Sequence, residues 1–381
     1  MTATRTTPLP LELGPNLIDH YYRGGDRIAK LRGIRTTSDH QPEEWLAATV
    51  SRHGEETIGL ARTTGGDLLR DLVAADHAAW VGPDHAAARD RSDLGILVKL
   101  LDPRTRLPVH VHPDRAFATS HLDCPYGKTE AWFILDAEPG CAVYLGWKAD
   151  VDPDELARRR EAQDSEWMLS RMNRLEVSPG MAVLVPAGQV HAIDAGIFLA
   201  EVQEPTDFSI VLEWSITTST RDQSHLGIGF DAVMPAVSTS RLDPARLDFA
   251  ALLDTSRPDG LVRLSDLALR GEAEVDLMPA AAAAYFTLRH AAPEADARIP
   301  VTAGFAVVLV LSGSGSITGT DGATVGVSAG NVFAVPHAFG DWTVSGDVHL
   351  LIAGPGVGWP ATLRNADGTG VDGTDAAGTA T

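Results

Sequence analysis

Two histidines, His110 and His112, alternate with valines in the sequence VHVHP. Residues i and i+2 of a β-strand point to the same side, so both imidazoles would project from one face of such a strand. At that spacing they can bind a single metal ion together. An isolated pair of this kind more often lies on a polar, solvated strand face, so the prediction of a metal site depends on further ligands.

Two other residues have the character of metal ligands. Glu130 leads into the apolar run 131–135, where an unpaired carboxylate would be costly to bury, so it requires a cation. His191 follows a Pro-Ala-Gly turn between two apolar segments. Three imidazoles and one carboxylate suit Zn²⁺, Mn²⁺, Fe²⁺, Co²⁺ or Ni²⁺. The sequence therefore predicts one divalent metal ion bound by His110, His112, Glu130 and His191.

Three charged residues near the predicted ligands could contact a substrate. Lys128 shares a strand face with Glu130 and Trp132, so it either enters the metal cavity, to bind an anion or transfer a proton, or caps the strand at the surface. Lys99 lies within the apolar run GILVKLLD, as an edge lysine or as an anchor for a substrate phosphate. Glu201 lies in FLAEVQ, on a solvated edge or within reach of a metal-bound sugar.

β-strands must position these residues. From residue 93 to residue 235, short apolar runs alternate with Pro- and Gly-containing turns, a pattern typical of small β-barrels. Residues 152–175 differ, because an Asp-Pro-Asp-Glu start and charges at helical spacing predict a helical insertion. Residues 1–92 include helical spacing at 66–75, and we expect this N-terminal segment to pack on the first barrel.

The C-terminal part repeats this alternation of apolar runs and turns less clearly. Residues 236–361 alternate strands with Gly-rich turns, and a stretch at 245–256 favours a short helix. The order strand, turn, strand, Val-Pro and His recurs from the first half, which indicates an internal repeat and a second, degenerate barrel. Its candidates His337, Asp341 and His349 lack an HxH pair and a matching Glu, so we expect a structural barrel.

Composition limits the partners of this 381-residue chain. A formal net charge of −20 opposes binding to nucleic acid or to a membrane, while a local lysine pocket could still bind an anionic small molecule. Two cysteines, no apolar leader and no membrane-length apolar run favour the cytoplasm. The tail 362–381 is rich in Gly, Ala, Asp and Thr and is predicted to be disordered. We expect a monomer or a homodimer.

Several motifs follow one another in a characteristic order, and cover residues 20–215 best. They are GGDRIAKLRG, EEWLAATVS, LGILVKLLD, LPVHVHPDRAFA, YGKTEAWFILDAEPGCAVYLGWK and PAGQVHAIDAGIFLAEVQ. Together they resemble the class I mannose-6-phosphate isomerases, a cupin family. The resemblance implies a mainly β bicupin fold of two jelly-roll barrels, with a helical insertion and a short N-terminal segment that contains helices. It also implies a zinc enzyme that interconverts mannose 6-phosphate and fructose 6-phosphate through an enediolate.

The resemblance assigns roles to single residues as well. The four metal ligands fall on the residues already predicted from spacing. Residues of the substrate pocket fall on Lys99, Lys128, Glu201 and Trp45, with Trp45 at the rim and Lys99 as the candidate phosphate anchor. Either Lys128 or Glu201 would be the base that moves a proton between C1 and C2.

Three positions depart from the family pattern. The family commonly has Gln where this chain has His110, and Ser where it has Pro108. A family arginine, suited to bind phosphate or stabilise the enediolate, corresponds to Ile210 or Val211, and Arg221 is a nearby arginine in the sequence. The missing guanidinium leaves two other functions open: an isomerase or epimerase of an unphosphorylated or different sugar, and a non-catalytic sugar-binding cupin. A third alternative is an Fe²⁺ oxygenase, because three histidines and one glutamate can also hold Fe²⁺.

Overall fold

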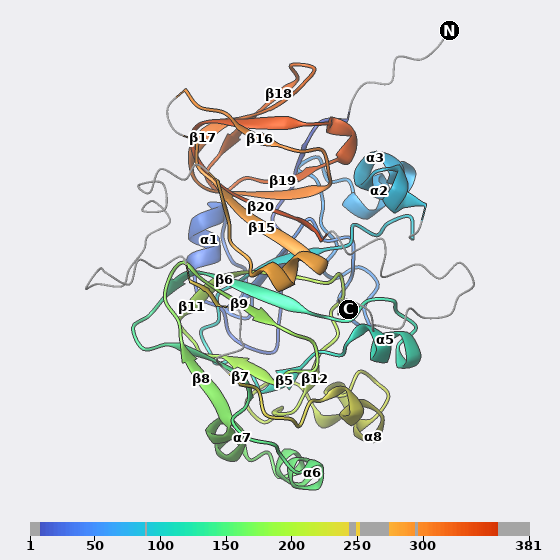
Figure 1. Ribbon diagram of the computed structural model, residues 1–381, viewed down its shortest axis with the longest axis vertical. Helices are drawn as coiled ribbons and strands as arrows, with labels where there is room; N and C mark the ends of the chain where they lie inside the picture. The colour runs from blue at the N-terminus through green and yellow to red at the C-terminus, as the bar shows by residue number, and fades with distance from the viewer. Residues whose placement is uncertain (1–7, 88–89, 244–248, 252–273, 294–295, 357–381) are drawn as a thin grey trace, which may run out of the picture.

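Three stacked sheets make up most of the molecule. The computed structural model describes residues 8–87, 90–243, 249–251, 274–293 and 296–356. The sheets are built from antiparallel strand pairs and follow one another along the long axis. The C-terminal sheet lies at one end, and helices α6 (Pro153–Glu161) and α7 (Ser165–Arg171) lie at the other (Figure 1).

Two of these sheets face each other. The seven-stranded sheet has the order β13 (Phe249–Ala251), β9 (Met181–Val185), β6 (Glu130–Ala137), β11 (Ile197–Gln203), β4 (Leu97–Leu101), β3 (Glu43–Leu46) and β2 (Leu17–Ile18). The five-stranded sheet has the order β12 (Ile210–Val211), β5 (His110–Val111), β10 (His191–Ile193), β7 (Ala142–Trp147) and β8 (Met172–Glu176). Trp132 and Ile134 of β6 share a buried apolar cluster with Val143 and Leu145 of β7, which joins the two sheets.

The third sheet has eight strands and encloses a core of its own. Its main path has the order β1 (Leu11–Glu12), β19 (Val332–Val335), β17 (Ala306–Gly319), β20 (Trp342–Pro355), β15 (Phe286–Ala291) and β14 (Glu274–Asp276). β16 (Ile299–Val301) pairs with β20, and β18 (Thr324–Ser328) pairs with β17. Val308, Val310 and Ile352 lie in this core.

The seven-stranded sheet is buried on both faces. Ala131 and Phe133 alternate with Trp132 along β6, so they point to the opposite side of the sheet. There they belong to one buried cluster with Leu309 and Leu351 of the C-terminal sheet. The strand that begins at Glu130 is therefore held by apolar contacts from two directions.

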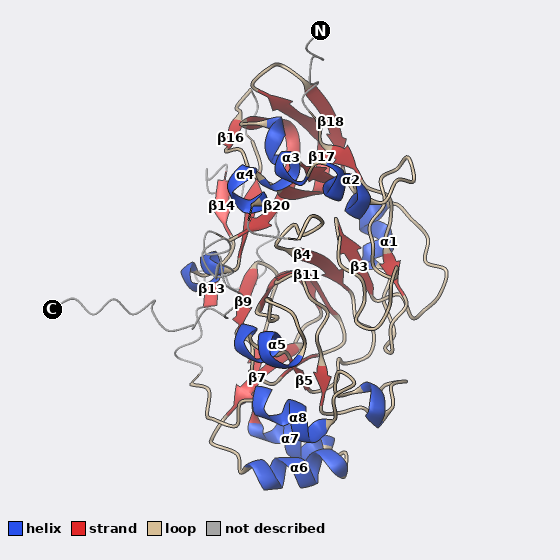
Figure 2. Cartoon of the chain, turned by 90° about the vertical axis from the view of Figure 1, so that its right-hand side faces the viewer, coloured by secondary structure: helices blue, strands red, loops and turns tan. Residues whose placement is uncertain are grey.

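Short helices cover the remaining surfaces (Figure 2). They are α1 (Arg27–Arg32), α2 (Leu69–Ala75), α3 (His77–Val81), α4 (Pro83–Ala86), α5 (Arg115–His121) and α8 (Phe230–Val233), besides α6 and α7. No helix among the described residues combines the length and the apolar character that crossing a membrane requires.

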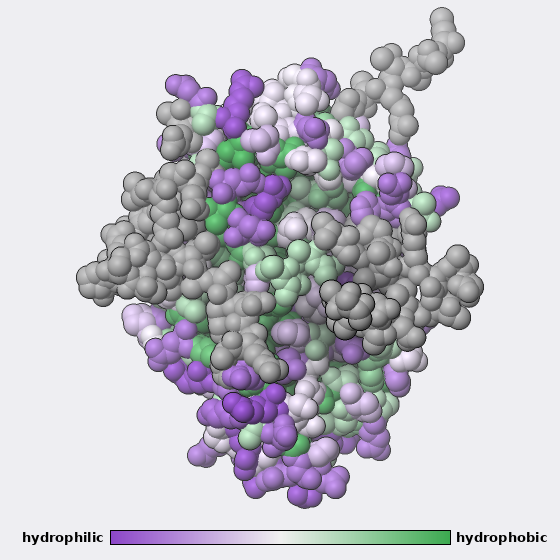
Figure 3. Space-filling view, in the orientation of Figure 1, coloured by the Kyte–Doolittle hydropathy of each residue, from purple (hydrophilic) through white to green (hydrophobic). Residues whose placement is uncertain are grey.

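Helices α6, α7 and α8 pack on the outer face of the five-stranded sheet. Asp152 caps α6 by accepting a hydrogen bond from the backbone N–H of Glu155. Leu156, Met168 and Phe230 bury the apolar sides of the three helices in a common cluster with the sheet. Polar side chains cover the end of the molecule that α6 and α7 form (Figure 3).

The mainly β fold class expected from the sequence is confirmed, with a correction of form. Among the described residues the sheets are open: no ladder joins the edge strands β12 and β8 to β13 and β2 of the facing sheet, and none joins β1 to β14 in the C-terminal sheet, so neither half forms a closed barrel there. The helix expected at 245–256 is wrong where the chain is described, since backbone pairing with β9 makes Phe249–Ala251 a strand. The domain boundaries stay predictions, and the tail 362–381 lies outside the described residues.

Candidate metal centre and substrate site

Three histidines meet on the five-stranded sheet. His110 of β5 and His191 of β10 are direct cross-strand partners, and His112 projects to the same side as His110. The ring centroid of His191 lies 4.0 Å from that of His110 and 4.7 Å from that of His112. All three side chains are buried and place one nitrogen atom each within 4.8 Å of the others. Such a cluster is close enough to share one metal ion.

Backbone carbonyls fix the orientation of each imidazole. Nδ1 of His110 lies 2.8 Å from the Pro108 carbonyl, Nδ1 of His112 lies 2.7 Å from that of Phe208, and Nδ1 of His191 lies 2.9 Å from that of Gln189. A carbonyl oxygen only accepts, so each Nδ1 carries a proton and each Nε2 presents a lone pair.

Burial keeps the three imidazoles neutral. It lowers the pKa of His112 and of His191 to about 3, and it holds the pKa of His110 well below its ordinary value. A neutral ring whose Nε2 lone pair points into the cluster is the form of histidine that binds metal.

Glu130 reaches the cluster from the facing sheet, at the start of β6. Its Oε2 lies 3.1 Å from Nε2 of His112, and its Oε1 lies 3.4 Å from Nε2 of His191. Among the described residues, Nε2 of His191 has no hydrogen-bond partner. A buried lone pair that faces a carboxylate oxygen needs a cation between them, so these residues fit a bound divalent metal ion.

Lys128 points into the same cavity, on the side that strand alternation indicates. Its Nζ lies 2.5 Å from Oε2 of Glu130 and 2.7 Å from Nε2 of His112. Burial alone would raise the pKa of Glu130, but Lys128 and His112 outweigh burial and hold this pKa well below its ordinary value. The carboxylate is therefore ionised, as metal binding requires.

Lys99 lies among three carboxylates. Its Nζ is 3.5 Å from Oε2 of Glu43, 3.7 Å from Oε1 of Glu201 and 3.7 Å from Oδ1 of Asp207. Burial would lower the pKa of Lys99, but these carboxylates reverse the effect and raise it above its ordinary value. The ammonium is charged and already neutralised, so a substrate phosphate would compete with three carboxylates for it.

The sequence analysis missed Glu43, which organises this side of the site. Its Oε1 accepts a short hydrogen bond from the Tyr22 hydroxyl, and its Oε2 accepts one from Nε1 of Trp45 at 2.9 Å. Trp45, expected at the pocket rim, is only 1% exposed and its ring lies 4.6 Å from Nζ of Lys99. Alternation in the strand EEWL, which puts Glu43 and Trp45 on one face, was the available signal.

The indole N–H of Trp132 lies within hydrogen-bond distance of both Glu201 and Glu130. Nε1 of Trp132 lies 3.1 Å from Oε2 of Glu201 and 3.1 Å from Oε1 of Glu130. In the sheet, Glu201 pairs with Trp132 on one side and with Lys99 on the other. Burial, reinforced by the charge of Glu130, raises the pKa of Glu201 to about 7. A carboxyl group with that pKa can take up and release protons near neutral pH.

The position of the missing family arginine is apolar and buried. Ile210 and Val211 form β12 and pair with β5, next to His110. Arg221 does not replace the guanidinium, because it forms an ion pair with Glu161 at the end of α6 and stacks over Phe230 of α8. Both partners lie on the outer side of the five-stranded sheet.

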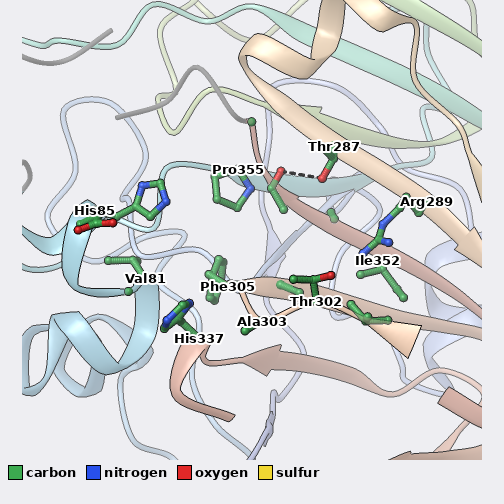
Figure 4. A pocket seen from close by; sticks show the side chains of 18 of the residues that line it. Val81, His85, Thr287, Arg289, Thr302, Ala303, Phe305, His337, Ile352 and Pro355 are labelled. Atoms are coloured by element: carbon green, nitrogen blue, oxygen red, sulfur yellow. Dashed lines mark hydrogen bonds between the residues drawn. The ribbon is translucent and has the colours of Figure 1, made fainter. Parts of the chain in front are cut away.

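Among all the described residues, the one cluster of side chains that could hold a metal ion is that of His110, His112 and His191. The described part of the second half of the chain therefore has no comparable centre. Oδ1 of Asp341 accepts a hydrogen bond from the backbone N–H of Ala303. His349 lies beside His290, with 3.2 Å between ring nitrogens. His337 lines a cavity of about 460 Å³ between α3–α4 and the C-terminal sheet (Figure 4).

The chain was compared with known protein families, sequences and structures. No protein-family model matches the sequence. The chain is 27% identical over 347 residues to the probable mannose-6-phosphate isomerase GmuF of Bacillus subtilis (strain 168), across 91% of this chain and 99% of that protein. The chain is thus similar along most of its length to a protein named as a probable mannose-6-phosphate isomerase.

Solved mannose-6-phosphate isomerases share the fold. The Bacillus subtilis enzyme superposes with a TM-score of 0.67 at 20% identity, covering 91% of this chain and 99% of that one. A mannose 6-phosphate isomerase bound with zinc and yttrium superposes with a TM-score of 0.65 at 13% identity, covering 92% of this chain and 100% of that one. The mainly β fold expected from the resemblance therefore has solved counterparts, while the roles of single residues stay predictions.

Proposed function

We propose that this protein is a metal-dependent aldose–ketose isomerase that interconverts mannose 6-phosphate and fructose 6-phosphate. One observation carries the proposal: the lone pairs of three neutral histidines converge on ionised Glu130, and Lys128 and Glu201 lie beside them. The site thus combines a place for a divalent cation with an ammonium group and a carboxyl group of near-neutral pKa. Relatives named mannose-6-phosphate isomerases indicate the sugar.

His110, His112, Glu130 and His191 would hold the metal ion. Zinc is the first candidate, because three imidazoles and a carboxylate suit it and a protein of similar fold binds it. Mn²⁺, Fe²⁺, Co²⁺ and Ni²⁺ are compatible with the same donors. When bound, the metal ion supplies a Lewis acid that stabilises negative charge on the sugar oxygens.

Lys128 and Glu201 would carry the proton transfers. Isomerisation removes the C2 proton of the open-chain aldose and returns it to C1, while a hydroxyl proton passes from O2 to O1. We assign the carbon-bound proton to Glu201, because its pKa of about 7 lets it act as base and then as acid. The Lys128 ammonium would donate a hydrogen bond to the enediolate oxygens.

A second candidate function is isomerisation or epimerisation of an unphosphorylated sugar. Two observations favour it: Lys99 is surrounded by carboxylates, and Ile210 and Val211 occupy the place of the family arginine. Both features lower the affinity of this part of the pocket for a phosphate dianion.

Metal analysis combined with a substrate panel tests the proposal. The purified protein should contain about one divalent ion per chain and convert mannose 6-phosphate faster than mannose or fructose. Glu130→Ala should lose the metal and the turnover together, whereas Glu138→Ala, at an exposed carboxylate, should keep both. Wild-type turnover by Glu130→Ala would overturn the proposal. Oxygen consumption with bound iron, or sugar binding without conversion, would support the oxygenase or the sugar-binding cupin instead.

A further inference from the structure

The segment 51–59, here called the rim loop, packs against the substrate side of the site. Nδ2 of Asn16 donates to the carbonyls of Trp45 at 2.9 Å and Gly59 at 2.7 Å, which fastens one end of the loop. Gly59 has a φ of +98°, and a Cβ there would lie 2.6 Å from the Trp45 ring. The loop therefore contacts the same tryptophan that underlies Lys99.

The other side of the rim loop touches the segment next to the metal ligands. The backbone N–H of His53 donates to Oδ2 of Asp207 at 3.2 Å, and Asp207 is one of the carboxylates around Lys99. The His53 ring lies edge-on to Phe208, with 5.4 Å between centroids. The carbonyl of Phe208 in turn orients His112. The loop thus borders both the lysine and the metal side of the pocket.

Side chains on this side of the site become progressively more exposed. The side-chain exposure rises from 0% at His191 and 5% at Lys99 to 14% at Asp207. Beyond Asp207, Arg52 is half-buried and His53 is exposed. A sugar whose reacting carbons lie at the metal centre would therefore extend its far end towards Arg52 and His53.

Arg52 differs from the other basic side chains around the site in its partners. The others are held by carboxylates: Lys99 by three, Lys128 by Glu130, Arg115 by Glu204 and Arg106 by Glu213. Nη1 of Arg52 donates to the backbone carbonyl of Asp19 at 3.1 Å, and no carboxylate in the described part of the chain pairs with its guanidinium. Its charge remains available to an anion.

We propose that Arg52, with His53 beside it, binds the phosphate group of the sugar substrate. This inference rests on the proposed function and supplies the guanidinium that is missing at Ile210 and Val211. The guanidinium offers the forked N–H donors that suit phosphate oxygens, and its position at the solvent edge avoids full desolvation of a dianion. Burial lowers the pKa of the nearby His20, the carboxylates of Glu43 and Asp207 raise it, and the positive charges of Arg52 and Lys99 lower it.

Kinetics of Arg52→Gln with two substrates test this assignment. The KM for mannose 6-phosphate should rise roughly 10- to 100-fold, because a charge-assisted hydrogen bond to the substrate is lost. The kcat should change little, and kcat/KM for unphosphorylated mannose should stay within about twofold. His53→Gln should raise the KM less. Arg158→Gln, which removes the same charge from the exposed face of α6, is the matched control and should leave the KM unchanged.

Inorganic phosphate separates this inference from the proposed function. Phosphate should inhibit the wild-type enzyme competitively with mannose 6-phosphate, and Arg52→Gln should weaken that inhibition while Arg52→Lys weakens it less. An unchanged KM in a folded Arg52→Gln protein would overturn the assignment. If the wild-type protein did not convert mannose 6-phosphate, the proposed substrate would be refuted instead. Calorimetric binding of phosphate to the wild type and to Arg52→Gln would then decide the role of Arg52, and equal affinities would reject it.

Discussion

Oε1 of Glu130 lies 3.4 Å from Nε2 of His191, and among the described residues this nitrogen has no hydrogen-bond partner. Glu130 comes from the seven-stranded sheet and His191 from the five-stranded sheet, so a cation between them links two layers of the fold. Metal binding should consequently act on stability as well as on catalysis.

Removal of the metal should lower the melting temperature and abolish turnover. A ligand that binds only the folded chain stabilises it by about 2.7 kcal/mol at a free concentration one hundred times its Kd. Thermal unfolding with and without a chelator measures this effect, and the five candidate metal ions can be added back one at a time. Full activity in protein shown by elemental analysis to be metal-free would contradict the prediction.

Glu43→Gln should destabilise the fold and impair substrate binding. The change removes one of the carboxylates around buried Lys99 and weakens the acceptor for Tyr22 and Trp45. Loss of one partner of a buried charge network costs roughly 3 kcal/mol. Urea unfolding measures this loss, with Glu166→Gln on the exposed side of α7 as the control. Equal unfolding midpoints of the two variants would show that Glu43 has no such role.

Trp132→Phe should slow catalysis and shift its pH profile. The indole Nε1 donates to both Glu130 and Glu201, and phenylalanine keeps the apolar ring but removes this donor. Without the donor, the ionised form of Glu201 is less favoured, so its pKa should rise further above its ordinary value. We expect the acid limb of the profile, where activity rises as Glu201 loses its proton, to move to a higher pH, and kcat to fall about tenfold or more. A pH profile identical to that of the wild type would exclude Glu201 as the base.

His290 should make the apo-protein less stable in mild acid. Burial, assisted by His349, lowers the pKa of His290 to about 4, from 6.5 in the unfolded chain. Between these values the unfolded chain binds the extra proton, so stability falls as the pH decreases from 6.5 to 4, by up to about 3 kcal/mol. In His290→Gln the fall should be smaller than in the wild type. His121→Gln, at the exposed end of α5, should fall as the wild type does.

Strand alternation explains why part of the site was predictable. The period of two placed Lys128, Glu130 and Trp132 on one face, and the structure brings all three together around the histidines. The HxH spacing likewise put His110 and His112 on one side of β5. These relationships lie within single strands, where local geometry decides the direction of a side chain.

Relationships between distant segments were not predictable in the same way. The partners of Lys99 come from β3, β11 and the loop before β12, and no local pattern encodes their meeting at one ammonium group. The expectation of a free phosphate anchor at Lys99 overlooked Glu43 and Asp207 for this reason. The apolar spacing at 245–256 suggested a helix, but pairing with β9 decides the conformation of Phe249–Ala251. Tertiary pairing commonly overrides local preference in short segments.

The apolar face of β6 opposite the metal centre limits which truncations and substitutions of the C-terminal sheet the metal site can tolerate. Ala131 and Phe133 belong to the same buried cluster as Leu309 and Leu351, and they neighbour Glu130 and Trp132 in the sequence. A shortened chain without the C-terminal sheet would expose that face to water, so the metal-binding part has no autonomy as a folding unit. We expect a substitution such as Leu309→Ala, at a residue that contacts neither metal nor sugar, to lower turnover because Glu130 would be held less firmly in position.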